Sequence, residues 1–100
     1  MAKSKTEIIH DIEHLIARNG AKWGEWYVGL CADPKSTLVS RHNFKQGTDV
    51  GAIRTATTEI QAQEVVEFFM RTRGTKGHAA SFNAGDIYVY AYRMSRHTKP

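Results

Sequence analysis

Residues 23–42, WGEWYVGLCADPKSTLVSRH, decide the fold that we expect for this chain. The run from about residue 24 to 32 is aromatic and apolar, which predicts a β-strand. The residues that favour the strand are Trp26, Tyr27, Val28, Leu30 and Cys31. Gly29, in the middle of this run, marks either a bulge or a place where another group closely approaches the backbone.

The second half of the same stretch predicts a helix over residues 33–42. Asp33 is a residue type preferred at the N-cap, and Pro34 fits the first turn, where its missing N–H is not needed. We expect Leu38 and Val39 to pack against the sheet. A strand that leads directly into a helix with basic residues at its end is a layout that a phosphodiester-binding site can use.

Two longer amphipathic helices are predicted, over residues 4–18 and 58–73. Each opens with the spacing of a capping box, a Ser or Thr followed three residues later by Glu or Gln, which satisfies backbone N–H groups at a helix start. The pairs are Ser4 with Glu7 and Thr58 with Gln61. Apolar side chains recur at the helical period, so one face of each helix is expected to face the core.

Two further strands are predicted, over residues 50–56 and 86–94. The second, DIYVYAYRM, is the clearest strand in the chain because its side chains alternate between two kinds. Ile87, Val89 and Ala91 alternate with Tyr88, Tyr90 and Tyr92. The tyrosines either pack beneath a helix or form an aromatic surface on which bases stack. The glycine-containing residues 74–85 predict a loop.

This alternation of helices and strands predicts an α+β fold, with a small, mainly antiparallel three-stranded sheet packed with three helices. One hundred residues suffice for one hydrophobic core, so we expect a single domain over residues 1–100. Residues 93–100 contain Arg93, Arg96, His97 and Lys99 and predict a basic, flexible tail.

Composition narrows the class of protein and of partner. The chain is 41% hydrophobic and 24% charged, which is typical of globular domains. A net charge of +4 and a pI near 9.4 favour an anionic partner such as nucleic acid. The single cysteine, Cys31, excludes an internal disulfide and is expected to be a buried thiol. No apolar run approaches the roughly 20 residues of a membrane span, so we expect a cytoplasmic protein with no membrane partner.

The central stretch resembles the second half of a GIY-YIG nuclease domain. Tyr27, Val28 and Gly29 match the YIG element, and the Asp-Pro pair, Leu38, a β-like segment and a T/S-E-x-x-A helix follow in the same order. The similarity covers about residues 26–74. It implies a tyrosine on each of two strands, an arginine about ten residues after YIG and a His or Tyr four residues further on. It also implies a glutamate on the later helix that binds one divalent metal ion.

Those residue types suit phosphodiester cleavage. A metal ion polarises the phosphate, a tyrosine activates water and an arginine offsets the charge of the transition state. The chain departs from this set at two positions, because Thr37 stands where the arginine is expected and Val66 where the glutamate is expected. The GIY element is also absent ahead of residue 23.

Other residues of the chain could take over the missing roles in two ways. A shift of one turn would let Arg41 and Glu67 replace the missing arginine and glutamate. The C-terminal strand would take the place of the missing first strand if it lay beside residues 26–31, with Tyr88 or Tyr90 as its tyrosine.

Three functions follow as alternatives. The first is a GIY-YIG-like domain that has lost catalysis and binds DNA or RNA, with no cofactor required. Its expected contact residues are Lys35, Arg41, His42, Lys45, Arg54, Lys76, Arg93 and Arg96. The second is an active endonuclease that uses Mg²⁺ or Mn²⁺. Its expected catalytic residues are Tyr27, Arg41, His42 and Tyr88, with Glu67 as the metal ligand. The third is a protein-interaction module that uses the tyrosine strand or an exposed sheet edge.

Overall fold

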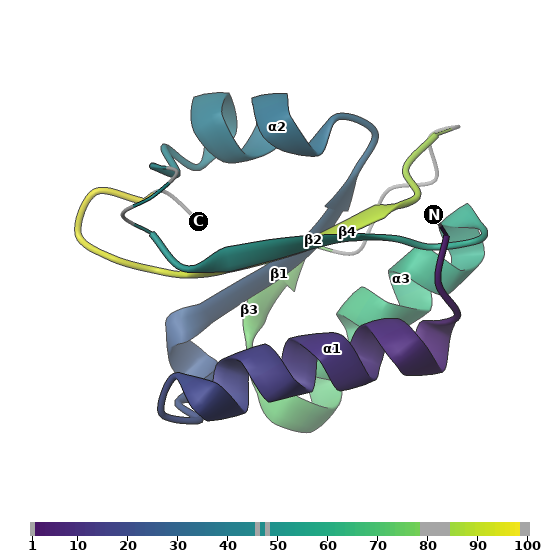
Figure 1. Cartoon of the computed structure of the whole chain (residues 1–100), viewed down its shortest axis with the longest axis horizontal. Helices are drawn as coiled ribbons and strands as arrows, with labels where there is room; N and C mark the ends of the chain where they lie inside the picture. Colours follow the sequence, from purple (N-terminus) through teal and green to yellow (C-terminus); the bar gives the residue numbers. More distant parts are fainter. Residues whose placement is uncertain (1, 46, 48, 79–84, 99–100) are drawn as a thin grey trace.

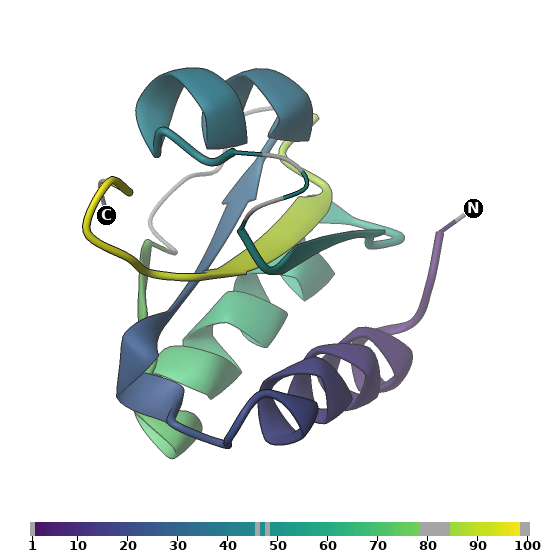
Figure 2. The ribbon, with the colours of Figure 1, turned by 60° about the vertical axis from the view of Figure 1, so that its left-hand side comes forward.

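A sheet lies between two layers of helix in the computed structural model, which describes residues 2–45, 47, 49–78 and 85–98 (Figure 1). On one side of the sheet lie α1 (Lys5–Arg18) and α3 (Glu59–Phe68). On the other side lies α2 (Pro34–Ser36), as the view in Figure 2 also shows. This arrangement confirms the α+β class with three helices.

The sheet has four strands, β1 (Trp26–Cys31), β2 (Gly51–Thr55), β3 (Lys76–His78) and β4 (Tyr88–Arg93). Their order across the sheet is β2-β4-β1-β3. β4 is antiparallel to both of its neighbours, whereas β3 is parallel to β1. The predicted mainly antiparallel sheet of three strands was therefore wrong in its number of strands, because a fourth strand, parallel to β1, makes the sheet mixed.

The unpredicted strand β3 lies inside the segment that we expected to be a loop. Its three residues, Lys-Gly-His, have neither the alternation nor the apolar character that marks a strand. The strand forms because Gly77 lets two backbones approach. A Cβ at this position would collide with the carbonyl oxygen of Val28 on β1. The glycine that suggested a loop is thus the residue that permits the pairing.

The first predicted capping box is complete, and the second is formed only in part, through the Thr58 side chain. Ser4 Oγ accepts a hydrogen bond from the Glu7 N–H at 3.2 Å, and the Glu7 carboxylate accepts one from the Ser4 N–H at 3.1 Å. Thr58 Oγ1 accepts from the Gln61 N–H at 3.1 Å. Gly74 ends the second long helix with a φ of 79°, in the left-handed region where glycine has no steric penalty.

Two helices continue into π-helical turns, in which the hydrogen bonds span five residues instead of four. α2 runs on as η2 (Thr37–Arg41), and α3 runs on as η3 (Phe69–Arg73). The sequence predicted both segments as helical, but it gave no sign of the wider turns.

The core has two parts, one on each face of the sheet. The larger part joins α1 and α3 to the sheet through Ile8, Ile12, Ile16, Trp26, Val28, Leu30, Ala56, Ala62, Val65, Val66, Phe69, Val89 and Ala91. The smaller part lies beneath α2 and η2 and consists of Tyr27, Cys31, Leu38, Tyr90 and Tyr92. β1 is buried on both faces, which explains why it reads as a continuous apolar run.

The tyrosine strand shows the predicted alternation. Val89 and Ala91 face the larger core, while Tyr90 and Tyr92 are 2% and 0% exposed beneath the α2 layer. Of the two interpretations left open by the sequence, packing under a helix is therefore confirmed for these two side chains. In the smaller core Leu38 is buried as predicted, but Val39 is 51% exposed, so its predicted packing against the sheet was wrong.

None of the helices among the described residues combines the length and the apolar character needed to cross a membrane.

The larger core gives a direct test of the packing. Ile12→Ala should lower the free energy of unfolding by about 2–5 kcal/mol, because Ile12 is only 1% exposed and its truncation leaves a cavity. Ile60→Ala is the matched control on α3, where the side chain is 63% exposed, and should change the stability by no more than about 0.5 kcal/mol. Urea unfolding followed by tryptophan fluorescence measures both. Equal losses would contradict the packing described.

Candidate functional site

His42 and three tyrosines form a buried cluster between η2 and the sheet. His42 is 2% exposed. Its Nε2 lies 2.8 Å from the hydroxyl of Tyr90, and its Nδ1 lies 3.0 Å from the hydroxyl of Tyr92. A neutral imidazole has one donor and one acceptor nitrogen, so one tyrosine donates to it and the other accepts. We call Tyr27, His42, Tyr90 and Tyr92 the tyrosine–histidine cluster.

Tyr27 forms the outer side of this cluster. Its ring stacks on Tyr92 with 5.4 Å between centroids, and it lies 4.7 Å from the His42 ring. At 9% exposed, it is the member with the most surface in contact with solvent. Tyr27 is therefore the cluster residue that a bound ligand would meet first.

The phenol groups of the cluster are held in the neutral form. Burial raises the pKa of Tyr90 and Tyr92 well above the usual value, and the neighbouring Tyr27 adds to the effect. Burial also raises the pKa of Tyr27, against which the Arg41 guanidinium acts in the opposite direction. At neutral pH these hydroxyls can donate or accept hydrogen bonds, but they are poor general bases.

Gly29 is required by the ring of Tyr90. The two residues are paired across β1 and β4, and the tyrosine ring lies directly over the glycine. A Cβ at position 29 would be 2.5 Å from the Tyr90 hydroxyl oxygen and 2.6 Å from Cζ. Of the two interpretations of this glycine, close approach of another group is therefore confirmed.

The π-helical turn η2 determines which side chain enters the cluster. The His42 N–H donates to the carbonyl of Thr37, five residues earlier, at 3.2 Å. This wider turn accommodates one residue more than an α-helical turn would. As a result His42 points inward to the tyrosines, while Arg41 is exposed.

Basic side chains lie at the border of the cluster. Lys76 on β3 is paired with Tyr27, and His78 is paired with Gly29, so both side chains emerge on the same face of the sheet as Tyr27. Both are exposed. Arg41 lies close enough to influence the pKa of Tyr27 and Tyr90. We call Arg41, Lys76 and His78 the basic border.

Two of the predicted nucleic-acid contacts lie on the other face of the sheet. Arg54 forms an ion pair with Asp11 of α1 at 2.9 Å. Arg93 forms one with Glu25 at 3.2 Å, next to the buried Trp26. The structure does not bring these two arginines together with Arg41.

The remaining predicted contacts are distributed around the α2 layer. Lys35 lies on α2 and lines a groove beside β2, and Lys45 is exposed in the loop after η2. Arg96 is exposed beyond the end of β4. His42 was predicted to contact phosphate, but it is buried, and such a contact would require it to leave its two tyrosine partners.

The residues proposed for an active nuclease are not gathered at one point. Tyr27 and His42 are in contact, with Arg41 nearby. Glu67, however, lies in the α3 layer on the opposite side of the sheet and pairs with Arg71 at 3.4 Å. Val66, at the position of the expected glutamate, is fully buried in the larger core.

The C-terminal strand β4 lies beside β1, as its proposed replacement of the missing first strand requires. β4 pairs antiparallel with β1, and Tyr88 is opposite Cys31 at the end of the pair. Tyr88 is half-buried beside the cluster. Cys31 itself is buried as expected, and burial raises the pKa of its thiol. In the described part of the chain, no three His, Cys, Asp or Glu side chains are placed so that they could share a metal ion.

Hydrogen bonds hold much of the predicted basic tail, residues 93–100. Arg93 belongs to β4, the Asn43 side chain donates to the carbonyl of His97 at 2.8 Å, and His97 Nε2 is 2.6 Å from the Asp49 carboxylate. Lys99 and Pro100 lie outside the described residues. The mobility of this tail stays a prediction.

Sequence reasoning missed the contribution of β3 to the site. Lys76 was predicted as a phosphate contact in a loop, and His78 was not predicted at all. The only signal in the sequence is the Lys-Gly-His run, whose central glycine allows pairing with β1. Exposure alternates in this run, with the side chains on either side of the glycine outermost.

The contact between Gly29 and Tyr90 predicts an asymmetry between two glycines. Gly29→Ala should cost about 1–3 kcal/mol of stability because the added methyl group overpacks the cluster. Gly24→Ala is the matched control, since no atom lies within 4 Å of a Cβ there. Thermal or urea unfolding checks both variants. A Gly29→Ala protein as stable as the parent would show that the ring of Tyr90 does not lie over this position.

The buried phenols also predict loss of stability at high pH. A raised pKa in the folded state means that the tyrosine contribution is complete below the unfolded-state value of about 10 and decreases as the pH rises above it. The free energy of unfolding should then decrease by up to about 1.4 kcal/mol per pH unit for each tyrosine. Tyr92→Phe should reduce this slope by one tyrosine's share. Urea unfolding at increasing pH measures it, and tyrosinate absorbance from Tyr90 and Tyr92 in the folded protein near pH 10 would contradict it.

Comparison of the chain with protein-family models, with curated proteins and with solved structures finds no match. The GIY-YIG resemblance thus rests on the motif around Tyr27 and stays a prediction.

Proposed function

We propose that the protein is a nucleic-acid-binding domain on a GIY-YIG-like scaffold that has lost the residues for phosphodiester cleavage. The observation that carries this proposal is the basic border beside Tyr27. Arg41 and Lys76 reach this surface from two segments far apart in the sequence, and neither has an acidic partner within 4 Å among the described residues. Unpaired cations beside an aromatic ring that is only 9% exposed suit a phosphate backbone more than a stacked base.

The distribution of acidic residues supports the same surface. All glutamates lie on α1, α3 or the short 3₁₀ turn η1 (Trp23–Glu25). They are Glu7, Glu13, Glu25, Glu59, Glu64 and Glu67. On the α2 side the carboxylates are aspartates with structural partners, such as Asp33, which caps α2, and Asp49, which binds His97. The α2 side of the sheet is therefore the side on which a polyanion meets less repulsion.

The comparison of site residues with the family pattern supports loss of catalysis. Thr37 carries no charge that could offset the charge of a phosphodiester transition state. Glu67 is separated from Tyr27 by the sheet and is paired with Arg71. The endonuclease alternative, with Mg²⁺ or Mn²⁺ bound by Glu67, would need α3 and the tyrosine–histidine cluster to share one site. We also propose a cytoplasmic location, which suits the free thiol of Cys31 because thiols stay reduced there.

Salt dependence tests the proposed contact surface. Binding of a fluorescein-labelled DNA duplex of about 20 base pairs should weaken linearly on a log–log plot of affinity against salt, with each phosphate contact adding about 0.9 to the slope. Arg41→Ala and Lys76→Ala should each lower the slope by about one and weaken binding for every sequence tested. The same titration with single-stranded DNA and RNA identifies the preferred form.

The control is Arg71→Ala, which removes an exposed arginine from the other side of the sheet and should leave the slope unchanged. Equal effects of all three substitutions, or binding that does not depend on salt, would contradict the proposal. Magnesium-dependent plasmid nicking that is lost in Tyr27→Phe would show that cleavage has survived.

A further inference from the structure

β2 is an edge strand whose outer side offers backbone hydrogen-bonding groups. Val50 accepts from the Arg93 N–H, and the Ala56 N–H donates to Ile87, so even-numbered residues of this segment bond inward to β4. In an antiparallel pair the bonding direction alternates. The N–H and C=O groups of Gly51, Ile53 and Thr55 therefore point outward, away from the sheet.

Part of this outer edge is already covered. At its end the Lys3 N–H donates to the Thr55 carbonyl at 2.7 Å, in a parallel bridge that shows the edge accepting an extended segment. The Arg54 guanidinium donates to the Ile53 carbonyl at 2.9 Å. In the part of the chain that the structure describes, both backbone groups of Gly51 and the N–H groups of Ile53 and Thr55 are left along the edge.

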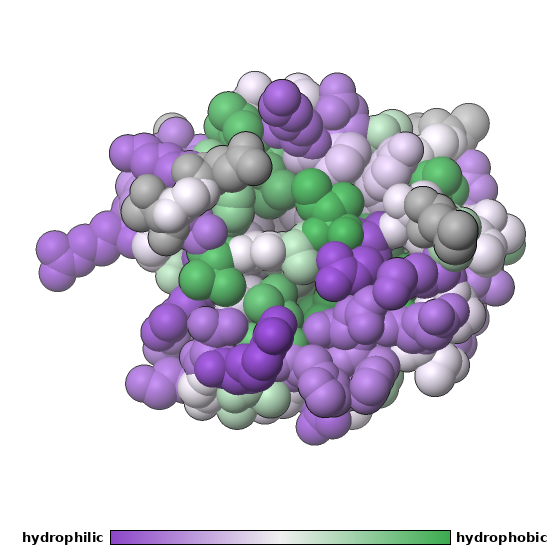
Figure 3. Space-filling view, in the orientation of Figure 1, coloured by the Kyte–Doolittle hydropathy of each residue, from purple (hydrophilic) through white to green (hydrophobic). Residues whose placement is uncertain are grey.

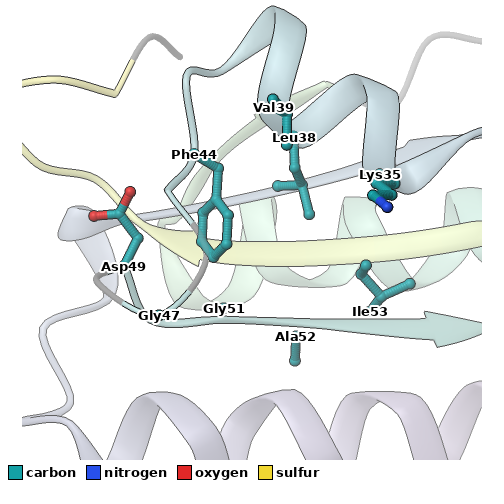
Figure 4. Close-up of a pocket in the computed structure, with 9 residues that line it drawn as sticks. All are labelled: Lys35, Leu38, Val39, Phe44, Gly47, Asp49, Gly51, Ala52 and Ile53. Atoms are coloured by element: carbon teal, nitrogen blue, oxygen red, sulfur yellow. The ribbon is translucent and has the colours of Figure 1, made fainter.

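An apolar groove of about 470 Å³ lies directly above this edge, between β2 and the α2 layer (Figure 4). Phe44 reaches down to Gly51, where its ring occupies the space of a Cβ, and Ile53 points up from the strand. Val39 and Ile53 are 51% and 40% exposed. Figure 3 shows hydrophobic side chains gathered around the middle of this face, framed by hydrophilic ones.

The charges below the edge favour an anion. Lys35 lies at the groove, and Asp49, the one carboxylate among the lining residues, is bound by His97 and by the Lys45 N–H. Below the edge, two cations, Lys3 and Arg54, share a single carboxylate, Asp11. The side of the edge below the strand is thus left with more positive than negative charge, whereas Lys35 and Asp49 balance at the groove.

We propose that the edge of β2 and the groove above it bind an extended, acidic peptide segment of a partner protein. The segment adds to the sheet as a further strand and bonds to Gly51 and Ile53. Alternate side chains of a strand point to opposite faces. Aliphatic side chains on one face of the segment enter the groove beside Val39 and Ile53, and acidic ones on the other face approach Lys3 and Arg54.

The chemistry of the surface distinguishes this occupant from two others. A second copy of the chain would bring two positively charged edges together, which opposes pairing of β2 with β2. A nucleic acid would meet an apolar groove and a row of alternating backbone donors and acceptors, for which a peptide backbone is the better match. Arg41 and Lys76 do not line the groove, so this proposal and the nucleic-acid proposal can fail separately.

The test uses the full chain and a capped peptide of about eight residues, roughly the length of a strand, in which Glu alternates with an aliphatic residue. Versions with Val, Ile or Leu form the probe set. Amide hydrogen exchange measured by NMR should show protection of Gly51 and Ile53 when the probe binds. Replacing every Glu of the probe by Lys should weaken binding at least about tenfold, and methylating alternate backbone nitrogens should abolish it.

Matched substitutions test whether binding depends on the groove or on nonspecific hydrophobic contacts. Val39→Glu should weaken binding of the acidic probes at least about fivefold, because it places a carboxylate in the groove. Ile60→Glu changes an aliphatic residue on α3 that is also more than half exposed, and it should leave binding unchanged.

Several results would overturn the proposal. These are binding to none of the acidic probes at about millimolar concentration, equal binding of the Lys version, or binding without protection of the two amides. Protection that appears with rising protein concentration alone, together with a dimer mass, would assign the edge to a second copy. Protection by a DNA oligonucleotide would assign it to nucleic acid.

Discussion

The hydrogen bonds between His42 and the hydroxyls of Tyr90 and Tyr92 join the α2 layer to the sheet. Without partners, these buried polar groups would each oppose folding by roughly 1–3 kcal/mol. With partners, they determine which way η2 is rotated, because the ring of His42 must reach both hydroxyls. That rotation leaves Arg41 on the exposed side of the turn. Both candidate surfaces depend on this one arrangement.

Much of the fold could be predicted because its signals are local. The Ser4–Glu7 capping box and the alternation in β4 each depend on residues close in sequence, and both are confirmed. β3 could not be predicted, because it exists only through the close approach of Gly77 to β1. The orientation of His42 could not be predicted either, since a π-helical turn shifts the side-chain register by one residue.

The candidate site was predictable in part. Arg41 lies close enough to Tyr27 to influence its pKa, and Lys76 is paired with Tyr27 from a strand that the sequence did not predict. Arg54 and Arg93 were selected for their charge, but each has a carboxylate partner on the other face of the sheet. The charge of a side chain can be read from the sequence. Its ion-pair partner and the face of the sheet on which it lies depend on the register of the strands.

Chemical-shift mapping of the ¹⁵N-labelled protein with a short DNA or RNA oligonucleotide tests the central claim most directly. If nucleic acid binds at the basic border, the perturbed amides should cluster at Tyr27, Arg41 and Lys76 and weaken together as salt is added. Perturbations centred on α1 and α3, or none at low salt, would contradict the account.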